Sequence, residues 1–180
     1  MMLHKITLLS ILILVGINTF AEVSSGPGLG QAATADEIAQ WDIGVMPDGE
    51  GLPPGQGTVA EGKIVYQQQC LSCHGQIGLG DSADQLAGAK MKLTSEYPEQ
   101  TIGTYWPYAT TLFDMIRRSM PMTNPGSLSD DQVYAVTAYL LYLNNIINES
   151  DVMNAETLAG VKMPNHDGFI NIYELEKSPE

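Results

Sequence analysis

The stretch Cys70-Leu71-Ser72-Cys73-His74 decides the fold of this 180-residue chain. It has the C-x-x-C-H spacing at which two thiols can each form a thioether bond to a vinyl group of the same porphyrin. The next residue, His74, then offers its imidazole to the iron from one face. We therefore expect one covalently attached haem c, bonded to Cys70 and Cys73, with His74 as an axial iron ligand.

Two other kinds of site use closely spaced cysteines, and the sequence favours neither. A structural zinc site needs four ligands, whereas the chain after residue 21 offers only two Cys and two His, and His166 lies far along the chain in a Pro- and Gly-containing tail. A thioredoxin-type dithiol needs a βαβ surround, and no alternating strand pattern of any length is visible. Haem attachment therefore remains the best interpretation of the motif.

The second axial ligand has to come from outside the motif. Methionine sulfur, histidine nitrogen or lysine nitrogen could serve, and the histidine after the motif is His166. Met120 follows an expected helix in a loop, and a loop residue can approach the iron from the face opposite His74. We expect Met120 to be this ligand, with Met122 or Met163 as the alternatives.

Helix-start signals predict an all-α fold. Thr58-x-x-Glu61 and Ser129-x-x-Gln132 are capping boxes, which predict helices from Val59 to about Cys70 and from Asp130 to about Leu143. A further helix over residues 108–119 is expected, because its apolar side chains recur at spacings near 3.6.

The first 21 residues have the features of an export signal. Lys5 precedes an apolar run over residues 6–17, which is too short to span a bilayer, and small residues follow at Thr19 and Ala21. This pattern predicts a signal peptide cleaved after Ala21. We expect export to a bacterial periplasm and no membrane span in the mature form.

Composition divides the remainder into three zones. Residues 22–57 contain eight Gly and four Pro, which predicts an irregular arm. A short helix over residues 33–41 is possible within it, and we expect the arm to pack on the core or on a partner. Residues 58–147 form the expected cytochrome c domain, and residues 148–180 form a polar tail with one helical candidate over 155–161.

The charge balance limits the choice of partners. The chain has 8 Lys and Arg against 21 Asp and Glu, a formal net charge of −13. Nucleic-acid affinity comes largely from basic side chains that neutralise phosphates, so we expect no nucleic-acid partner. An acidic surface of this kind favours basic protein partners.

The motif and its surroundings resemble the class I c-type cytochromes. The matching residues are Gly62 and Tyr66 ahead of the motif, Met120-Pro121, and Val136-x-x-Tyr139. The resemblance implies three to four helices around one covalent haem. It also implies that the first and last helices cross at Gly62, with Tyr66 and Tyr139 filling the crossing.

The same resemblance implies residues near the haem propionates. Trp106 or Tyr105 would be the buried aromatic there, and Arg117 or Arg118 could pair with a propionate, although an arginine at a helix end also suits solvent and the helix dipole. One departure is visible. The family usually has a proline after the motif whose carbonyl orients the ligating histidine, and residues 84–88 contain none, so the residue that supplies this carbonyl stays open.

Longer phrases resemble the cytochrome subunits of periplasmic sulfite dehydrogenases, including the Sox-type sulfane dehydrogenases. They are Ile43-Gly44-Val45-Met46-Pro47, Tyr105-Trp106-Pro107-Tyr108, Arg117-Arg118-Ser119-Met120-Pro121, Pro125-Gly126-Ser127-Leu128 and Val161-Lys162-Met163-Pro164-Asn165. This resemblance implies an electron-accepting subunit beside a molybdenum-cofactor subunit that oxidises sulfite or protein-bound sulfane sulfur.

These expectations describe an electron carrier and not an enzyme in its own right. A monohaem protein would take single electrons from the dehydrogenase and pass them to another periplasmic carrier or an oxidase. Two alternatives remain: a free-standing shuttle to a terminal oxidase, and a haem enzyme or sensor with an open coordination site. The long arm and tail favour a subunit with a standing interface over a shuttle.

Overall fold

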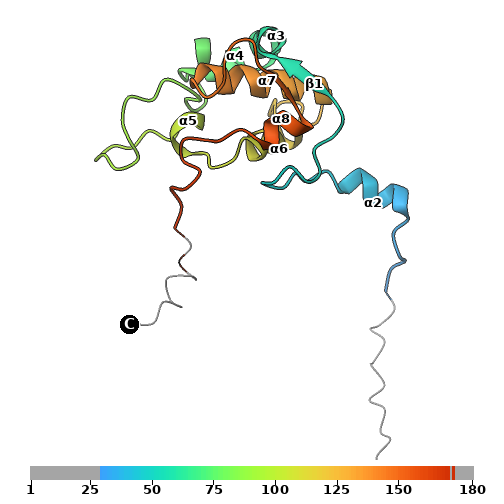
Figure 1. Cartoon of the computed structure of the whole chain (residues 1–180). Helices are drawn as coiled ribbons and strands as arrows, with labels where there is room; N and C mark the ends of the chain where they lie inside the picture. The colour runs from blue at the N-terminus through green and yellow to red at the C-terminus, as the bar shows by residue number, and fades with distance from the viewer. Residues whose placement is uncertain (1–28, 171, 173–180) are drawn as a thin grey trace, which may run out of the picture. The chain divides into compact units, whose positions relative to one another are not determined.

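The structure is a computed structural model that describes residues 29–170 and residue 172 (Figure 1). It divides into two units, residues up to Trp41 and residues from Asp42 on, and each is described by itself. The predicted signal peptide over residues 1–21 lies outside the described residues. The first unit contributes one described helix, α2 (Ala35–Trp41), which buries none of its side chains.

Helix α3 (Val59–Gln69) begins at the predicted capping box. The Thr58 hydroxyl accepts a hydrogen bond from the Glu61 backbone N–H at 3.2 Å, and the Glu61 carboxylate accepts one from the Thr58 N–H at 2.9 Å. Both orphan donors of the first turn are thereby satisfied, which fixes where the helix starts.

Helix α7 (Asp130–Leu143) is the centre of the second unit. It also starts at its predicted capping box, which joins Ser129 and Gln132, and every residue from Val133 to Leu141 is buried. Helix α6 (Ala109–Ser119) packs against α7. The three principal helices of the sequence prediction are confirmed, with ends that differ by at most one residue.

Helices α3 and α7 cross in direct backbone contact. A Cβ atom on Gly62 would collide with the Ala135 carbonyl group of α7. Beside this contact the rings of Tyr66 and Tyr139 meet at 5.4 Å between centroids, tilted by 56°. The crossing implied by the cytochrome resemblance is therefore present, and glycine is needed because any side chain would separate the two helices.

Short elements complete the second unit. They are β1 (Gln56–Thr58), α4 (Leu71–His74), a 3₁₀ turn η1 (Gln76–Gly78), α5 (Ile102–Tyr105), β2 (Val152–Asn154) and α8 (Ala155–Ala159). Strands β1 and β2 pair antiparallel, with Gly57 opposite Met153. The sequence did not predict this pair, because three residues are too few to display an alternating pattern. The fold class is nevertheless all-α, as expected.

The second half of the predicted arm is part of the core. We call residues 42–53 the strap. Side chains of α6 and α7 form hydrogen bonds with its backbone. From α6, Asp114 accepts from the Val45 N–H at 3.0 Å, Arg117 donates to the Ile43 carbonyl at 3.2 Å, and Thr110 donates to the Pro47 carbonyl at 3.0 Å. From α7, the Tyr134 hydroxyl donates to the Pro53 carbonyl at 2.8 Å. These bonds replace the regular ladder that this Gly- and Pro-rich segment cannot form.

Candidate haem site

The C-x-x-C-H motif folds as a single helical turn that continues α3 after a change of direction. Cys70 is the C-cap of α3 and the N-cap of α4, and the N–H groups of Cys73 and His74 both donate to the Cys70 carbonyl, at 3.1 and 3.0 Å. Cys70 is half-buried and Cys73 is exposed, and both thiols are free. The turn thus brings two thiols and one imidazole together, as attachment to one porphyrin requires.

The His74 imidazole is held in one tautomer. Its Nδ1 atom lies 2.8 Å from the Asp84 carbonyl oxygen. A carbonyl only accepts, so Nδ1 carries the proton and the lone pair of Nε2 is free to bind a metal. This is the arrangement of a histidine that ligates iron, and it identifies Asp84 as the residue that supplies the orienting carbonyl.

The segment after the motif folds back on it through backbone bonds. The His74 carbonyl accepts from the Gly80 N–H at 2.8 Å, and the Cys73 carbonyl accepts from the Ala83 N–H at 2.9 Å. Gly75 makes the reversal with a φ of 72°, and a Cβ there would lie 2.5 Å from the Gly80 carbonyl oxygen. This turn places the Asp84 carbonyl beside His74, and the Asp84 side chain takes no part in the hydrogen bond.

The donor set fits haem attachment and does not fit zinc. Within residues 29–170 and 172, no three His, Cys, Asp or Glu side chains gather as a metal site. Burial, followed by the neighbouring Cys73, raises the pKa of the Cys70 thiol to about 11. A thiol that resists ionisation is a poor thiolate ligand for zinc.

The methionine candidates occupy different surroundings. Met120 ends α6, is half-buried and packs against the hydrophobic core, and its peptide bond to Pro121 is cis. Met122 is 77% exposed, whereas Met163 is 1% exposed within the core. Met120 is the candidate that is neither displayed to solvent nor enclosed by protein, and its role as a ligand stays a prediction.

The candidate propionate contacts are placed as follows. Trp106 is half-buried and packs against the core. Arg117 is engaged elsewhere, since its Nη1 bonds the strap and its Nε lies 3.1 Å from the Asp130 carboxylate. Arg118 pairs with the buried Asp114. Contacts of Trp106 and Arg117 with a propionate stay predictions, and for Arg117 the ion pair with Asp130 is a competing interaction.

The comparisons with known proteins agree with this geometry. The Cytochrome c family model matches residues 59–144. A chain in the crystal structure of the sulfane dehydrogenase SoxCD from Paracoccus pantotrophus is 42% identical, with a TM-score of 0.77, over 86% of this chain and 79% of that chain. The chain belongs to the class I c-type cytochromes. Family membership implies covalently bound haem c and a function in electron transfer.

A second relative matches a smaller part of the cytochrome. A thiosulfate dehydrogenase from Stutzerimonas stutzeri (strain A1501) is 33% identical over 90 residues, which are 49% of this chain and 28% of that protein. The chain thus spans less than a third of that relative's length. Both relatives are dehydrogenases of sulfur compounds by name.

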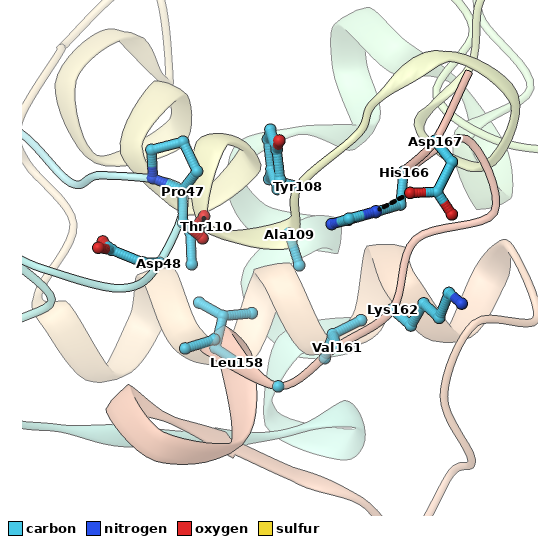
Figure 2. Close-up of a pocket in the computed structure, with 12 residues that line it drawn as sticks. Pro47, Asp48, Tyr108, Ala109, Thr110, Leu158, Val161, Lys162, His166 and Asp167 are labelled. Carbon is cyan, nitrogen blue, oxygen red and sulfur yellow. Dashed lines mark hydrogen bonds and ion pairs between the residues drawn. The ribbon is translucent and has the colours of Figure 1, made fainter. Parts of the chain in front are cut away.

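A cavity of the second unit is lined by none of the motif residues. It has a volume of about 550 Å³ and is lined by the strap, the start of α6 and the tail after α8 (Figure 2). His166 faces Tyr108 there, with ring centroids 5.3 Å apart, and its Nδ1 lies 2.7 Å from the Asp167 carboxylate. Neither His74 nor Met120 lines this cavity, so His166 lies in different surroundings from His74.

Two features of the site were missed by the sequence. The Asp84 carbonyl is a backbone group, so no residue type at that position announces it. The Tyr66 hydroxyl donates to the Gly75 carbonyl at 2.8 Å, although the sequence assigned Tyr66 only a packing role. No helix in the described part of the cytochrome is long and apolar enough to cross a membrane.

Proposed function

We propose that this chain is a periplasmic monohaem cytochrome that accepts single electrons from a molybdenum-cofactor dehydrogenase subunit and passes them to another carrier or an oxidase. The observation that carries the proposal is the 42% identity, over most of both chains, to a chain of a sulfane dehydrogenase structure. The substrate class would be sulfite or protein-bound sulfane sulfur. The single C-x-x-C-H motif supports one haem per chain.

The residues of this chain bind and orient, and they make no bonds in the substrate. Cys70 and Cys73 would hold the haem, His74 would bind the iron through Nε2, and Met120 would bind it from the other face. When bound, haem c supplies a one-electron couple between ferric and ferrous iron. If His74 and Met120 both bind the iron, no site would be left for oxygen or peroxide, and the protein would be a carrier and not a haem enzyme or sensor.

The contact with the dehydrogenase subunit would involve the first unit. Part of the arm and tail, including the strap and β2, packs on the cytochrome itself, so their length alone no longer argues for an interface. Helix α2, in contrast, exposes Ile38 and Trp41, which are three residues apart and share a helix face. This shared apolar face is where a partner protein would be expected to bind.

The test is purification of the tagged full chain from periplasm. The proposal predicts that a molybdenum-containing protein is retained and that sulfite or a persulfide substrate reduces the haem within the complex. Trp41→Ser should weaken retention, whereas the matched exposed Tyr97→Ser should not. Recovery of the cytochrome alone, with the haem still reduced by other periplasmic extracts, would favour the free shuttle.

The periplasmic location is tested on the same preparation. Cleavage after Ala21 predicts that the purified chain begins at Glu22, as read by N-terminal sequencing. A cytoplasmic chain that keeps residues 1–21 would contradict the location. The name of the second relative raises the alternative that the chain itself is catalytic. In that case the isolated cytochrome would oxidise thiosulfate in the presence of an artificial electron acceptor.

A further inference from the structure

Tyr66 is a buried residue whose packing role needs its ring but not its hydroxyl group. Its side chain is 1% exposed and lies at the crossing of α3 and α7 against Tyr139. A phenylalanine ring would fill the same volume and would need no hydrogen-bond partner. The hydroxyl therefore needs an explanation of its own.

The Tyr66 hydroxyl reaches the peptide that follows the axial histidine. It donates to the Gly75 carbonyl at 2.8 Å, while the Gly75 N–H donates to the Leu71 carbonyl at 3.0 Å. Burial raises the pKa of the Tyr66 phenol to about 12, so the group keeps its proton and donates throughout the neutral range. Hydrogen bonds thus fix both the N–H and the carbonyl group of Gly75.

The other bonds around His74 depend on the same peptide. The His74 carbonyl accepts from Gly80 at 2.8 Å, and the imidazole Nδ1 bonds the Asp84 carbonyl at 2.8 Å. The chain between these two groups turns at Gly75. A shift of Gly75 would therefore move the His74 imidazole relative to the Asp84 carbonyl that orients it.

We propose that Tyr66 is a positioning residue for the haem ligand: its hydroxyl, acting through the Gly75 carbonyl, keeps the His74 imidazole bonded to Asp84. This bond from Nδ1 raises the basicity of the coordinating nitrogen. A more basic ligand favours the ferric state, so Tyr66 lowers the midpoint potential of the bound haem. The inference requires bound haem c and does not depend on the dehydrogenase partner.

The test is Tyr66→Phe in the haem-loaded protein, with Tyr139→Phe as the matched control. Both variants keep a ring at the same crossing, but within the described residues the Tyr139 hydroxyl donates no hydrogen bond. Tyr66→Phe should shift the midpoint potential to a more positive value. It should also speed exchange of the His74 Nδ1 proton by about tenfold, as loss of one net hydrogen bond implies.

Several results would overturn the inference. One is an unchanged potential and proton exchange in Tyr66→Phe, and another is an equal shift in Tyr139→Phe, which would mean general loosening of the crossing. Should Tyr66→Phe fail to retain haem, the unaltered protein still provides a measurement by NMR. There the Tyr66 hydroxyl proton must be protected from exchange and coupled to the Gly75 carbonyl, and a freely exchanging hydroxyl contradicts the assignment.

Discussion

The Nδ1 atom of His74 lies 2.8 Å from the carbonyl oxygen of Asp84. The bond leaves Nε2 as the only ring nitrogen with a free lone pair, so Nε2 is the atom that would bind iron. A backbone hydrogen bond from the Ala83 N–H to the Cys73 carbonyl, at 2.9 Å, holds the two segments together. The geometry within the chain therefore supports His74 as one axial ligand, and the second ligand needs an experiment of its own.

Replacement of Met120 by alanine should remove the sulfur-to-ferric-iron charge-transfer band in the near infrared. The haem should stay attached, because Cys70 and Cys73 are unchanged. Met122→Ala is the control and should keep the band, since Met122 is largely exposed. Absorption spectra of the oxidised proteins make the comparison. Persistence of the band in Met120→Ala, with its loss in Met163→Ala, would move the ligand to Met163.

Replacement of Gly62 by alanine should destabilise the fold by about 1–3 kcal/mol, the usual cost of forcing extra volume into a packed core. The added methyl group would meet backbone of Ala135, which cannot turn aside like a flexible side chain. Gly44→Ala is the control, because its Cβ would meet nothing within 4 Å. Urea unfolding of the haem-loaded proteins gives the difference, and equal midpoints for the two variants would contradict the crossing.

Ile77 combines backbone strain with exposure. Its φ of 49° and ψ of 29° lie in the left-handed region, and its side chain is 54% exposed. Asparagine tolerates this conformation far better than a β-branched residue. Ile77→Asn should therefore stabilise the protein by about 1 kcal/mol. Ile64→Asn, at a helical position that is 56% exposed, should not stabilise the protein. An equal increase in the free energy of unfolding for Ile64→Asn would contradict the explanation by backbone strain at Ile77.

Glu61 should contribute to the loss of stability in acid. Hydrogen bonds from the Thr58 side chain and backbone lower the pKa of its carboxyl below the usual 4.5. A lowered folded pKa means stability that is present above the unfolded value and is lost as the pH falls through the folded value. Urea unfolding between about pH 6 and pH 3 should show a smaller decline for Glu61→Gln than for the unaltered protein.

The control for this titration is a second exposed carboxylate. Glutamine at position 61 still accepts the Thr58 hydrogen bonds but does not titrate. Glu96 accepts no hydrogen bond within the described residues, so Glu96→Gln should leave the acid decline as it is. The assignment to the Glu61 cap fails if both variants change the pH dependence to the same extent.

The sequence predicted the parts of the fold that depend on local chemistry. The capping boxes at Thr58 and Ser129 specify helix starts through neighbouring residues, and both helices form where expected. The Gly62 crossing and the motif turn were also expected, from resemblance and spacing. These features depend on residue types at fixed short separations, which a single sequence displays directly.

The remaining features depend on contacts between distant segments. Asp114 looks like an ordinary helical acid, yet it accepts the Val45 N–H of the strap. Asp84 acts through its carbonyl, which all residue types share. Tyr66 bonds Gly75 only because the motif turn reverses the chain. No local pattern encodes these partners, so the structure was needed to find them.

The most direct test of the account is the mass of the intact exported protein, read together with its pyridine haemochrome spectrum. The account predicts one haem per chain, retained after denaturation, and absent from the Cys70→Ser/Cys73→Ser variant. A colourless chain whose Cys70 and Cys73 bind zinc or form a disulfide would contradict haem attachment, and the proposed electron-transfer function would be lost with it.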